Sequence, residues 1–114
     1  MPYLLLIMEQ TEDRMNRPEE DGRAYYERMR QFGDGLKTRG ILKATDALKT
    51  DGVRVAVRNG RRSVVDGPFA EAKEMVGGFF LLDCDREEAM ALAAECPAAE
   101  WATVEVREVG RCWE

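Results

Sequence analysis

Two short segments without a polar residue constrain the fold of this chain most. Residues 4–8 are Leu-Leu-Leu-Ile-Met and residues 79–82 are Phe-Phe-Leu-Leu. A strand with one solvated face alternates apolar and polar residues, whereas a strand that is buried on both faces is apolar throughout. Both segments are far shorter than the roughly 20 residues that a membrane-spanning helix needs. We therefore predict that they form the two central strands of one sheet.

Two helices are predicted from apolar periodicity and end signals. Residues 18–39 place apolar side chains on one helical face, at spacings of four, three and four: Tyr25, Met29, Phe32 and Leu36. Gly40 follows as a C-terminal cap. The second helix begins after Asp85, where Glu88 completes a capping box, and it ends before Pro97.

Further strands and one more helix are expected between and after these elements. Residues 41–48 are a weak strand candidate, and 101–109 alternate as a strand with one solvated face. Asn59-Gly60, flanked by alternating valines in 53–57 and by 61–65, predicts a two-residue β-hairpin. Residues 70–76 are expected to form a short helix.

The predicted order is β-α-β, an inserted hairpin, then β-α-β. This order indicates an α+β, ferredoxin-like βαββαβ sandwich, with both helices on one side of an antiparallel sheet. A length of 114 residues fits a single domain over 1–114. We see no repeat and no linker.

The sheet face opposite the helices is expected to be apolar, because both central strands are apolar on each face. Monomers rarely expose contiguous apolar patches larger than a few hundred Å². A homodimer joined through the open sheet face would bury this surface. The alternative is that the inserted hairpin folds over it.

Composition excludes several classes of function. The net charge of −5 disfavours binding to nucleic acid. The chain contains no His, which removes the commonest general base and transition-metal ligand, and its three Cys form no CxxC pair. We expect no metal and no cofactor. The N-terminus lacks signal-peptide features, and no segment could span a membrane, so we expect a cytoplasmic protein.

The turn Asp66-Gly67-Pro68-Phe69 has two interpretations. As a corner, the Asp66 carboxylate accepts amide hydrogen bonds from residues after Pro68, and the Phe69 ring fills the core beneath. As a functional site, Asp66 is a general base or polar anchor at the mouth of a pocket. The residues alone favour the corner, since an isolated Asp in a turn is common.

The longer motif resembles a known family. Residues 65–71 with Lys73-Glu74 and Gly77-Gly78-Phe79 are similar to the signature of the DGPF proteins, within the YCII-related family. The similarity extends to the opening strand 3–7 and the closing strand 104–107. It implies a dimeric α+β barrel, a bacterial source, and a regulatory role beside an extracytoplasmic-function sigma factor. The family's biochemical activity is largely undefined.

One departure from that family concerns catalysis. The enzyme-like branch carries a His on the first helix and an Asp before a Pro after the second helix, proposed as a catalytic pair. The corresponding positions here fall near Met29 and at Cys96. Neither residue offers an obvious replacement for that proton transfer, so any remaining chemistry shifts toward Asp66.

Two functional hypotheses follow. The first is a dimeric small-ligand-binding or regulatory accessory protein, with a pocket between the first helix, the sheet and the motif loop. Its candidate ligand-binding residues are Tyr25, Met29, Asp66, Gly67, Pro68 and Phe69. The second is a lyase-like or isomerase-like enzyme acting on a small organic substrate, with Asp66 as the candidate catalytic residue. The role of Trp113 stays open.

Overall fold

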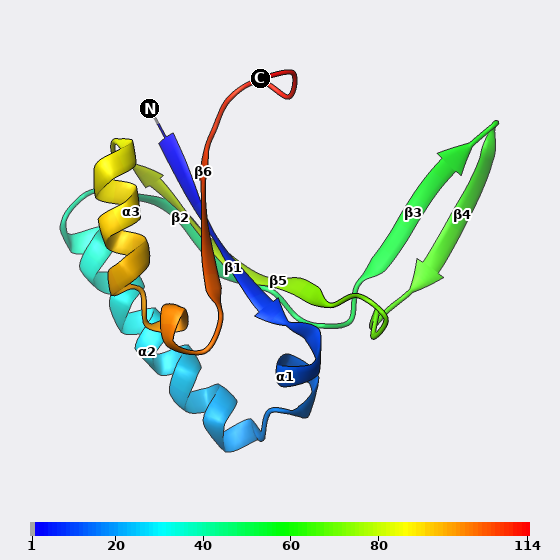
Figure 1. Ribbon diagram of the computed structural model, residues 1–114, viewed down its shortest axis with the longest axis horizontal. Coiled ribbons are helices and arrows are strands. Elements are labelled where there is room, and N and C mark those ends of the chain that lie inside the picture. The colour runs from blue at the N-terminus through cyan, green and yellow to red at the C-terminus, as the bar shows by residue number, and fades with distance from the viewer. Residues whose placement is uncertain (1) are drawn as a thin grey trace.

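A computed structural model of the chain describes residues 2–114. The strands of this part are β1 (Pro2–Gln10), β2 (Leu42–Ala47), β3 (Val53–Arg58), β4 (Arg61–Asp66), β5 (Glu74–Asp83) and β6 (Thr103–Glu108). The helices are α1 (Thr11–Asn16), α2 (Glu19–Thr38), α3 (Arg86–Glu95) and the short 3-10 helix η1 (Pro97–Glu100). Figure 1 shows their arrangement.

The main sheet has the strand order β2-β5-β1-β6, and every neighbouring pair is antiparallel. The two central strands are therefore β1 and β5, which contain the two continuously apolar segments. Together with α2 and α3, the four strands form the predicted ferredoxin-like α+β fold. The β3-β4 hairpin is inserted between the second and third strands of this core.

Alternation along β1 separates two faces of the sheet. Tyr3, Leu5 and Ile7 are buried beneath the helices, whereas the residues between them are only partly buried. Helical side chains complete the core on that face: Leu36, Ala89, Leu92, Ala93 and Cys96. The Phe32 ring meets Phe80 edge-on, with centroids 5.3 Å apart. Burial of these apolar side chains is the main stabilising term for so small a domain.

The opposite face of the sheet carries a row of partly exposed apolar residues. Leu4 lies opposite Leu81, and Leu6 lies opposite Phe79, so all four share the face without helices. The neighbouring strand β6 adds a charged border to this row, where Arg107 donates to Glu105 at 2.7 Å. The predicted open apolar face is therefore present in the chain.

Predicted helix ends are confirmed by their caps. The Asp85 carboxylate accepts the amide of Glu88 at 2.8 Å, at the start of α3. Gly40 follows α2 with a φ of 77°, a left-handed conformation that suits a residue without a side chain.

The prediction of a helix over residues 70–76 is wrong. Strand β5 begins already at Glu74, where Met75 pairs with Glu9 and Val76 with Met8. Pairing with a long neighbouring strand therefore outweighs the local helical pattern of a few residues. The short helix α1, which directly follows β1, was not predicted.

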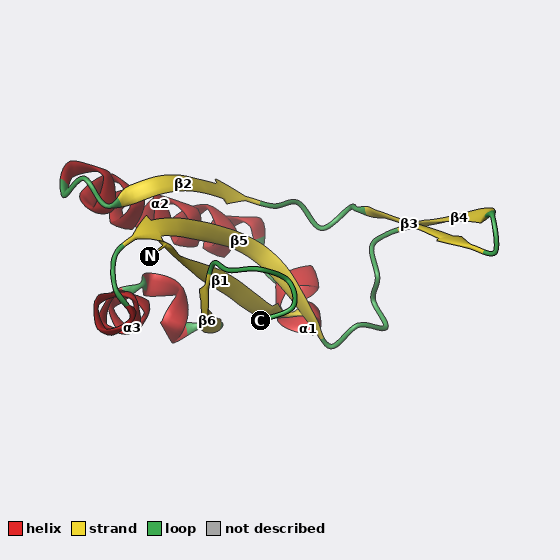
Figure 2. Ribbon diagram, turned by 90° about the horizontal axis from the view of Figure 1, so that it is seen from above, coloured by secondary structure: helices red, strands yellow, loops and turns green. Residues whose placement is uncertain are grey.

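The β3-β4 hairpin projects from the body as an arm, which Figures 1 and 2 show from two directions. Asn59 and Gly60 at its tip have φ values of 52° and 75°, as the predicted two-residue turn requires. The hairpin does not fold over the open sheet face, so that alternative is wrong. Gly67 and Gly52 join the two ends of the arm through a backbone hydrogen bond of 2.7 Å.

None of the helices in residues 2–114 combines the length and the apolar character needed to cross a membrane.

Candidate ligand-binding site

A buried carboxylate lies at the end of the central strand β1. Glu9 continues the row of Tyr3, Leu5 and Ile7 that faces the helices, and it is only 4% exposed. The facing strand provides the space through Gly77, where an added Cβ atom would lie 2.0 Å from Glu9 Oε2. The first glycine of the Gly77-Gly78 pair therefore makes room for a charge.

Two arginines neutralise this carboxylate from the segment that follows β1. Arg14 Nη1 donates to Glu9 Oε2 at 2.5 Å, and Arg17 Nη1 donates to Oε1 at 2.8 Å. Arg14 Nη2 also donates to the carbonyl of Leu48 at 2.7 Å, next to the end of β2. The Glu9–Arg14–Arg17 cluster thus holds one negative and two positive charges in a partly buried position.

An aromatic stack extends from this cluster. The Arg17 guanidinium lies 5.0 Å from the Tyr25 ring centre, and Tyr25 stacks on Trp101 with centroids 3.9 Å apart and planes 5° apart. Arg28 lies 5.4 Å from the centre of the Trp101 ring and pairs with Glu100. The stack holds α2 against the end of η1 through two stacked rings, each contacted by a cation that its ring attracts electrostatically.

Tyr25, Trp101 and the Glu9–Arg14–Arg17 cluster line a cavity of about 840 Å³ between α2 and the sheet. Its apolar wall includes Ile7, Met29 and Phe80, and its polar wall includes the Glu9–Arg14–Arg17 cluster. Five basic and four acidic side chains border it in total, a formal charge of +1 in a chain whose net charge is −5. This size and mixed lining are typical of sites for small organic molecules.

Two sulfur atoms meet at the positions that correspond to a proposed catalytic pair. That pair belongs to the enzyme-like branch of the family that the sequence motif resembles. Met29 Sδ and Cys96 Sγ lie 3.8 Å apart. Burial raises the pKa of the Cys96 thiol, so it stays protonated at neutral pH and is a poor nucleophile. The fold thus brings these two positions together without groups that could exchange a proton at neutral pH.

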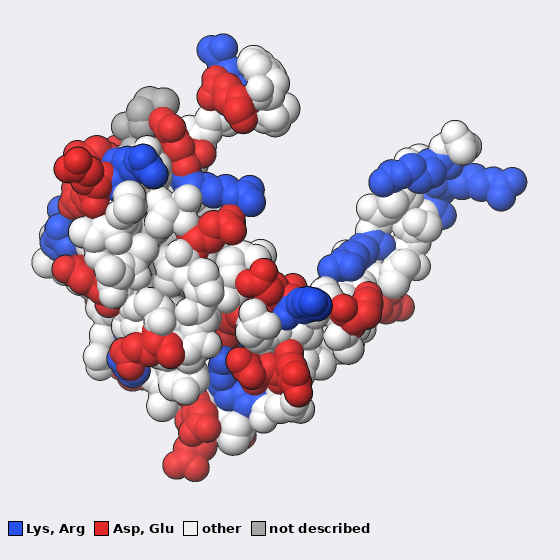
Figure 3. All heavy atoms as spheres, in the orientation of Figure 1, with Lys and Arg blue, Asp and Glu red and all other residues white. Residues whose placement is uncertain are grey.

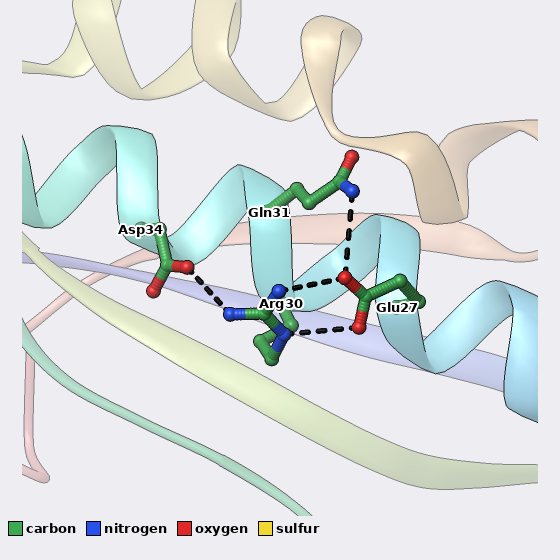
Figure 4. Close-up of polar contacts among 4 residues, drawn as sticks. All are labelled: Glu27, Arg30, Gln31 and Asp34. Carbon is green, nitrogen blue, oxygen red and sulfur yellow. Dashed lines mark hydrogen bonds and ion pairs between the residues drawn. The ribbon is translucent and has the colours of Figure 1, made fainter.

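Charged residues on α2 form a network of ion pairs, which Figure 4 shows in close-up, and two of them, Arg30 and Asp34, border the cavity. Arg30 Nη2 donates to Glu27 at 2.6 Å, and Arg30 Nη1 donates to Asp34 at 2.8 Å. The hydrogen bond from Arg30 lowers the pKa of Glu27 and raises that of Arg30 itself. Since all three side chains are at least half exposed, these pairs are satisfied surface contacts rather than a reactive group.

The predicted ligand-binding residues lie in two separate places. Tyr25 and Met29 line the cavity, whereas Asp66, Gly67, Pro68 and Phe69 lie at the base of the arm and line no part of it. Asp66 is exposed at the end of β4, and its carboxylate accepts no hydrogen bond from any group within residues 2–114. The expectation that Asp66 anchors the amides of its corner is therefore wrong, because the backbone pair Gly67–Gly52 closes the turn instead.

Phe69 does not fill the core, contrary to the corner interpretation. Its ring is half-buried at the base of the arm, and the Arg54 guanidinium lies 3.8 Å from the ring centre. An added Cβ at Gly67 would lie 2.8 Å from the Gly52 carbonyl oxygen and 3.1 Å from this ring. The motif thus forms a close-packed clamp at the base of the arm.

Sequence reasoning missed Glu9, Arg14, Arg17 and Trp101. A signal for Glu9 exists, since it lies two residues after Ile7, where the buried face of β1 continues. Arg14, Arg17 and Trp101 carry no such signal, because β1, the segment that follows it and the segment after η1 come together only when the sheet forms.

Residues 2–114 contain no group of three Cys, Asp or Glu side chains placed to hold a metal ion. Burial also raises the pKa of Cys84, and Cys112 is exposed near the C-terminus, away from the cavity.

A family model for the YCII-related domain matches residues 1–112, which is nearly the whole chain. The chain belongs to the YCII-related family. A search of curated proteins returns no match. The YCII-related domain of this chain therefore combines a ferredoxin-like core, a projecting arm and a cavity with a buried charge cluster.

Proposed function

We propose that this YCII-related protein binds a small organic anion, a carboxylate with an apolar or aromatic body, in the cavity beneath α2. The observation that carries the proposal is the Glu9–Arg14–Arg17 cluster in the cavity wall. Burying charged side chains costs free energy that apolar side chains in the same place would not cost. The cluster has two positive charges and one negative charge, so one positive charge is in excess. A ligand carboxylate would balance that charge.

Arg17 is the residue best placed to meet such a ligand. Its side chain is 14% exposed and borders the cavity, and within the described chain its Nε and Nη2 groups donate to no protein acceptor. Arginine offers paired donors that match the two oxygens of a carboxylate. The adjoining Tyr25 and Trp101 stack and the apolar wall would take the rest of the molecule.

Binding fits this cavity better than catalysis. Both oxygens of Glu9 already accept guanidinium N–H groups, and the Met29–Cys96 pair has no group that would exchange protons at neutral pH. Asp66 does not line this cavity, so the cavity gives no support to the hypothesis of an enzyme acting through that residue. A regulatory accessory role, linked to a sigma factor, rests on the resemblance to DGPF proteins alone.

We also propose that the protein is a homodimer joined through the open sheet face. The support is the row of Leu4, Leu6, Phe79 and Leu81, which within residues 2–114 no helix covers and the arm leaves free. Apolar rows of this kind mark surfaces between subunits.

The ligand proposal is tested with benzoate and its neutral analogue benzamide. Trp101 fluorescence is followed in a Trp113→Phe background, which removes the exposed second indole. We expect benzoate to change the signal and to bind at least about tenfold more tightly than benzamide, a difference of about 1.4 kcal/mol. Arg17→Met should abolish the preference, whereas Arg39→Met, which removes an exposed arginine paired with Glu88 outside the cavity, should preserve it.

Two outcomes would contradict the proposal. One is equal affinity for benzoate and benzamide, which would show that the excess charge plays no part. The other is the absence of any response from Trp101 to benzoate and to a short panel of aliphatic carboxylates, with Arg17 intact.

A further inference from the structure

The arm presents an apolar stripe that no other segment of residues 2–114 covers. Four valines lie on one face of the ribbon, each between 53% and 62% exposed: Val53, Val55, Val57 and Val64. A two-stranded hairpin by itself is at best marginally stable in water. Exposed stripes of this kind mark a surface that packs against a partner.

The base of the arm is built to hold it away from its own body. The amide of Gly67 donates to the Gly52 carbonyl at 2.7 Å, and the Arg54 guanidinium stacks on Phe69. Any side chain at Gly67 would collide with Gly52, so this position requires glycine. The DGPF turn therefore acts as the clamp that fixes the arm in its projecting position.

Charge distinguishes the arm from the rest of the molecule. The hairpin carries Arg54, Arg58, Arg61 and Arg62 but only one carboxylate, Asp66, a formal charge of +3. The chain as a whole carries −5, which leaves −8 on the body. Figure 3 shows the basic side chains gathered toward the far end of the arm and many acidic ones over the body.

We propose that the arm, held out by the DGPF clamp, packs its valine stripe against the body of a second copy of this chain. The positive arm and the negative body of another copy attract each other, which favours this partner. The net negative body would instead repel a nucleic acid. The contact is separate from the cavity and from the sheet-face interface, so it stands or falls independently of both.

Two neighbouring residues of β4 provide a matched pair for the test. Val64 lies on the valine face of the ribbon, and Ser63, which pairs with Ala56, lies on the opposite face. Val64→Glu and Ser63→Glu both add one negative charge to an exposed arm position. Any difference between them therefore reports the valine face and not the charge.

We expect Val64→Glu to raise the dissociation constant of self-association at least about tenfold, measured by sedimentation equilibrium. Ser63→Glu should raise it less than about threefold, the effect of a charge at an interface rim. Circular dichroism should show the same folded spectrum for both, since the arm contributes no residue to the hydrophobic core. Equal effects of the two changes, or wild-type protein that sediments at the 12.9 kDa chain mass, would overturn the proposal.

A photo-crosslinking residue at position 57 gives a second readout. Benzoylphenylalanine in place of Val57 should yield a covalent species of twice the chain mass, and the same residue in place of Ser63 should yield far less. Leu6→Glu distinguishes association through the arm from association through the sheet face. If Leu6→Glu produces monomers while Val64→Glu leaves self-association unchanged, the arm proposal fails and the sheet-face dimer stands. If instead Val64→Glu produces monomers while Leu6→Glu leaves self-association unchanged, the arm proposal is supported and the sheet face is excluded as the interface.

Discussion

At the scale of single residues, the glycine pair of the motif and the buried glutamate depend on each other: the space at the pair accommodates the glutamate, and the glutamate accounts for the glycine. Gly77 lies in β5 at an irregularity of the ladder with β1, where the absence of a side chain admits the Glu9 carboxylate. Glu9 in turn fixes Arg14 and Arg17. A motif glycine thus acts through the space it leaves rather than through backbone freedom.

Gly77→Ala should destabilise the protein, because the new methyl group would meet Glu9 Oε2 at 2.0 Å and force the cluster apart. Overpacking of this kind typically costs about 1–3 kcal/mol in free energy of unfolding, which urea denaturation measures. Gly35→Ala is the matched control. No atom lies within 4 Å of its added Cβ, and it sits within α2, so it should stabilise by up to about 1 kcal/mol. An unchanged midpoint for Gly77→Ala would contradict this account.

At the scale of elements, two aspartates that were both predicted to accept backbone amides have different roles. Asp85 caps α3 through the Glu88 amide at 2.8 Å, as its capping box predicts. Asp66 ends β4 and accepts no hydrogen bond within the described chain. The turn after Asp66 is held by backbone and ring contacts of Gly67 and Phe69.

Asp85→Ala and Asp66→Ala should therefore differ in their effect on stability. Loss of the helix cap should lower the free energy of unfolding by about 0.5–2 kcal/mol. The exposed Asp66 should change it by no more than about 0.5 kcal/mol, as surface positions without partners usually do. Chemical denaturation of both variants beside the parent checks this, and a larger loss for Asp66→Ala would restore the anchor interpretation.

At the scale of the whole molecule, the sheet has one face covered by helices and one that is open. Adjacent residues of β1 point to opposite faces: Leu5 is fully buried in the core, and Leu6 lies in the open row. The same substitution at the two positions therefore tests two different properties of the molecule.

Leu5→Glu should unfold the chain, since it places an unpaired charge in the core. Leu6→Glu should keep the fold and weaken self-association, because the charge lies at the proposed sheet-face interface. Circular dichroism reports folding, and sedimentation equilibrium reports the mass relative to the 12.9 kDa chain. A folded Leu6→Glu protein that associates as strongly as the parent would exclude the sheet face as the interface.

The sequence alone determined the elements whose signals are local. The apolar runs of β1 and β5, the periodicity of α2, the cap at Asp85 and the Asn59-Gly60 turn each depend on residues a few positions apart. Such patterns, with the order of elements, were sufficient for the ferredoxin-like core. They failed at residues 70–76, where pairing with β1 extended β5 against the local pattern.

Only the tertiary structure decided the site and the direction of the arm. The Glu9–Arg14–Arg17 cluster depends on a glycine almost 70 positions away, and the stack on Arg17 joins Tyr25 to Trp101 across the fold. The motif turn predicted a corner. It did not predict that Gly52 closes this corner or that the hairpin is held away from the body. Contacts between distant segments leave no periodic trace in a sequence, because each partner alone fits many environments.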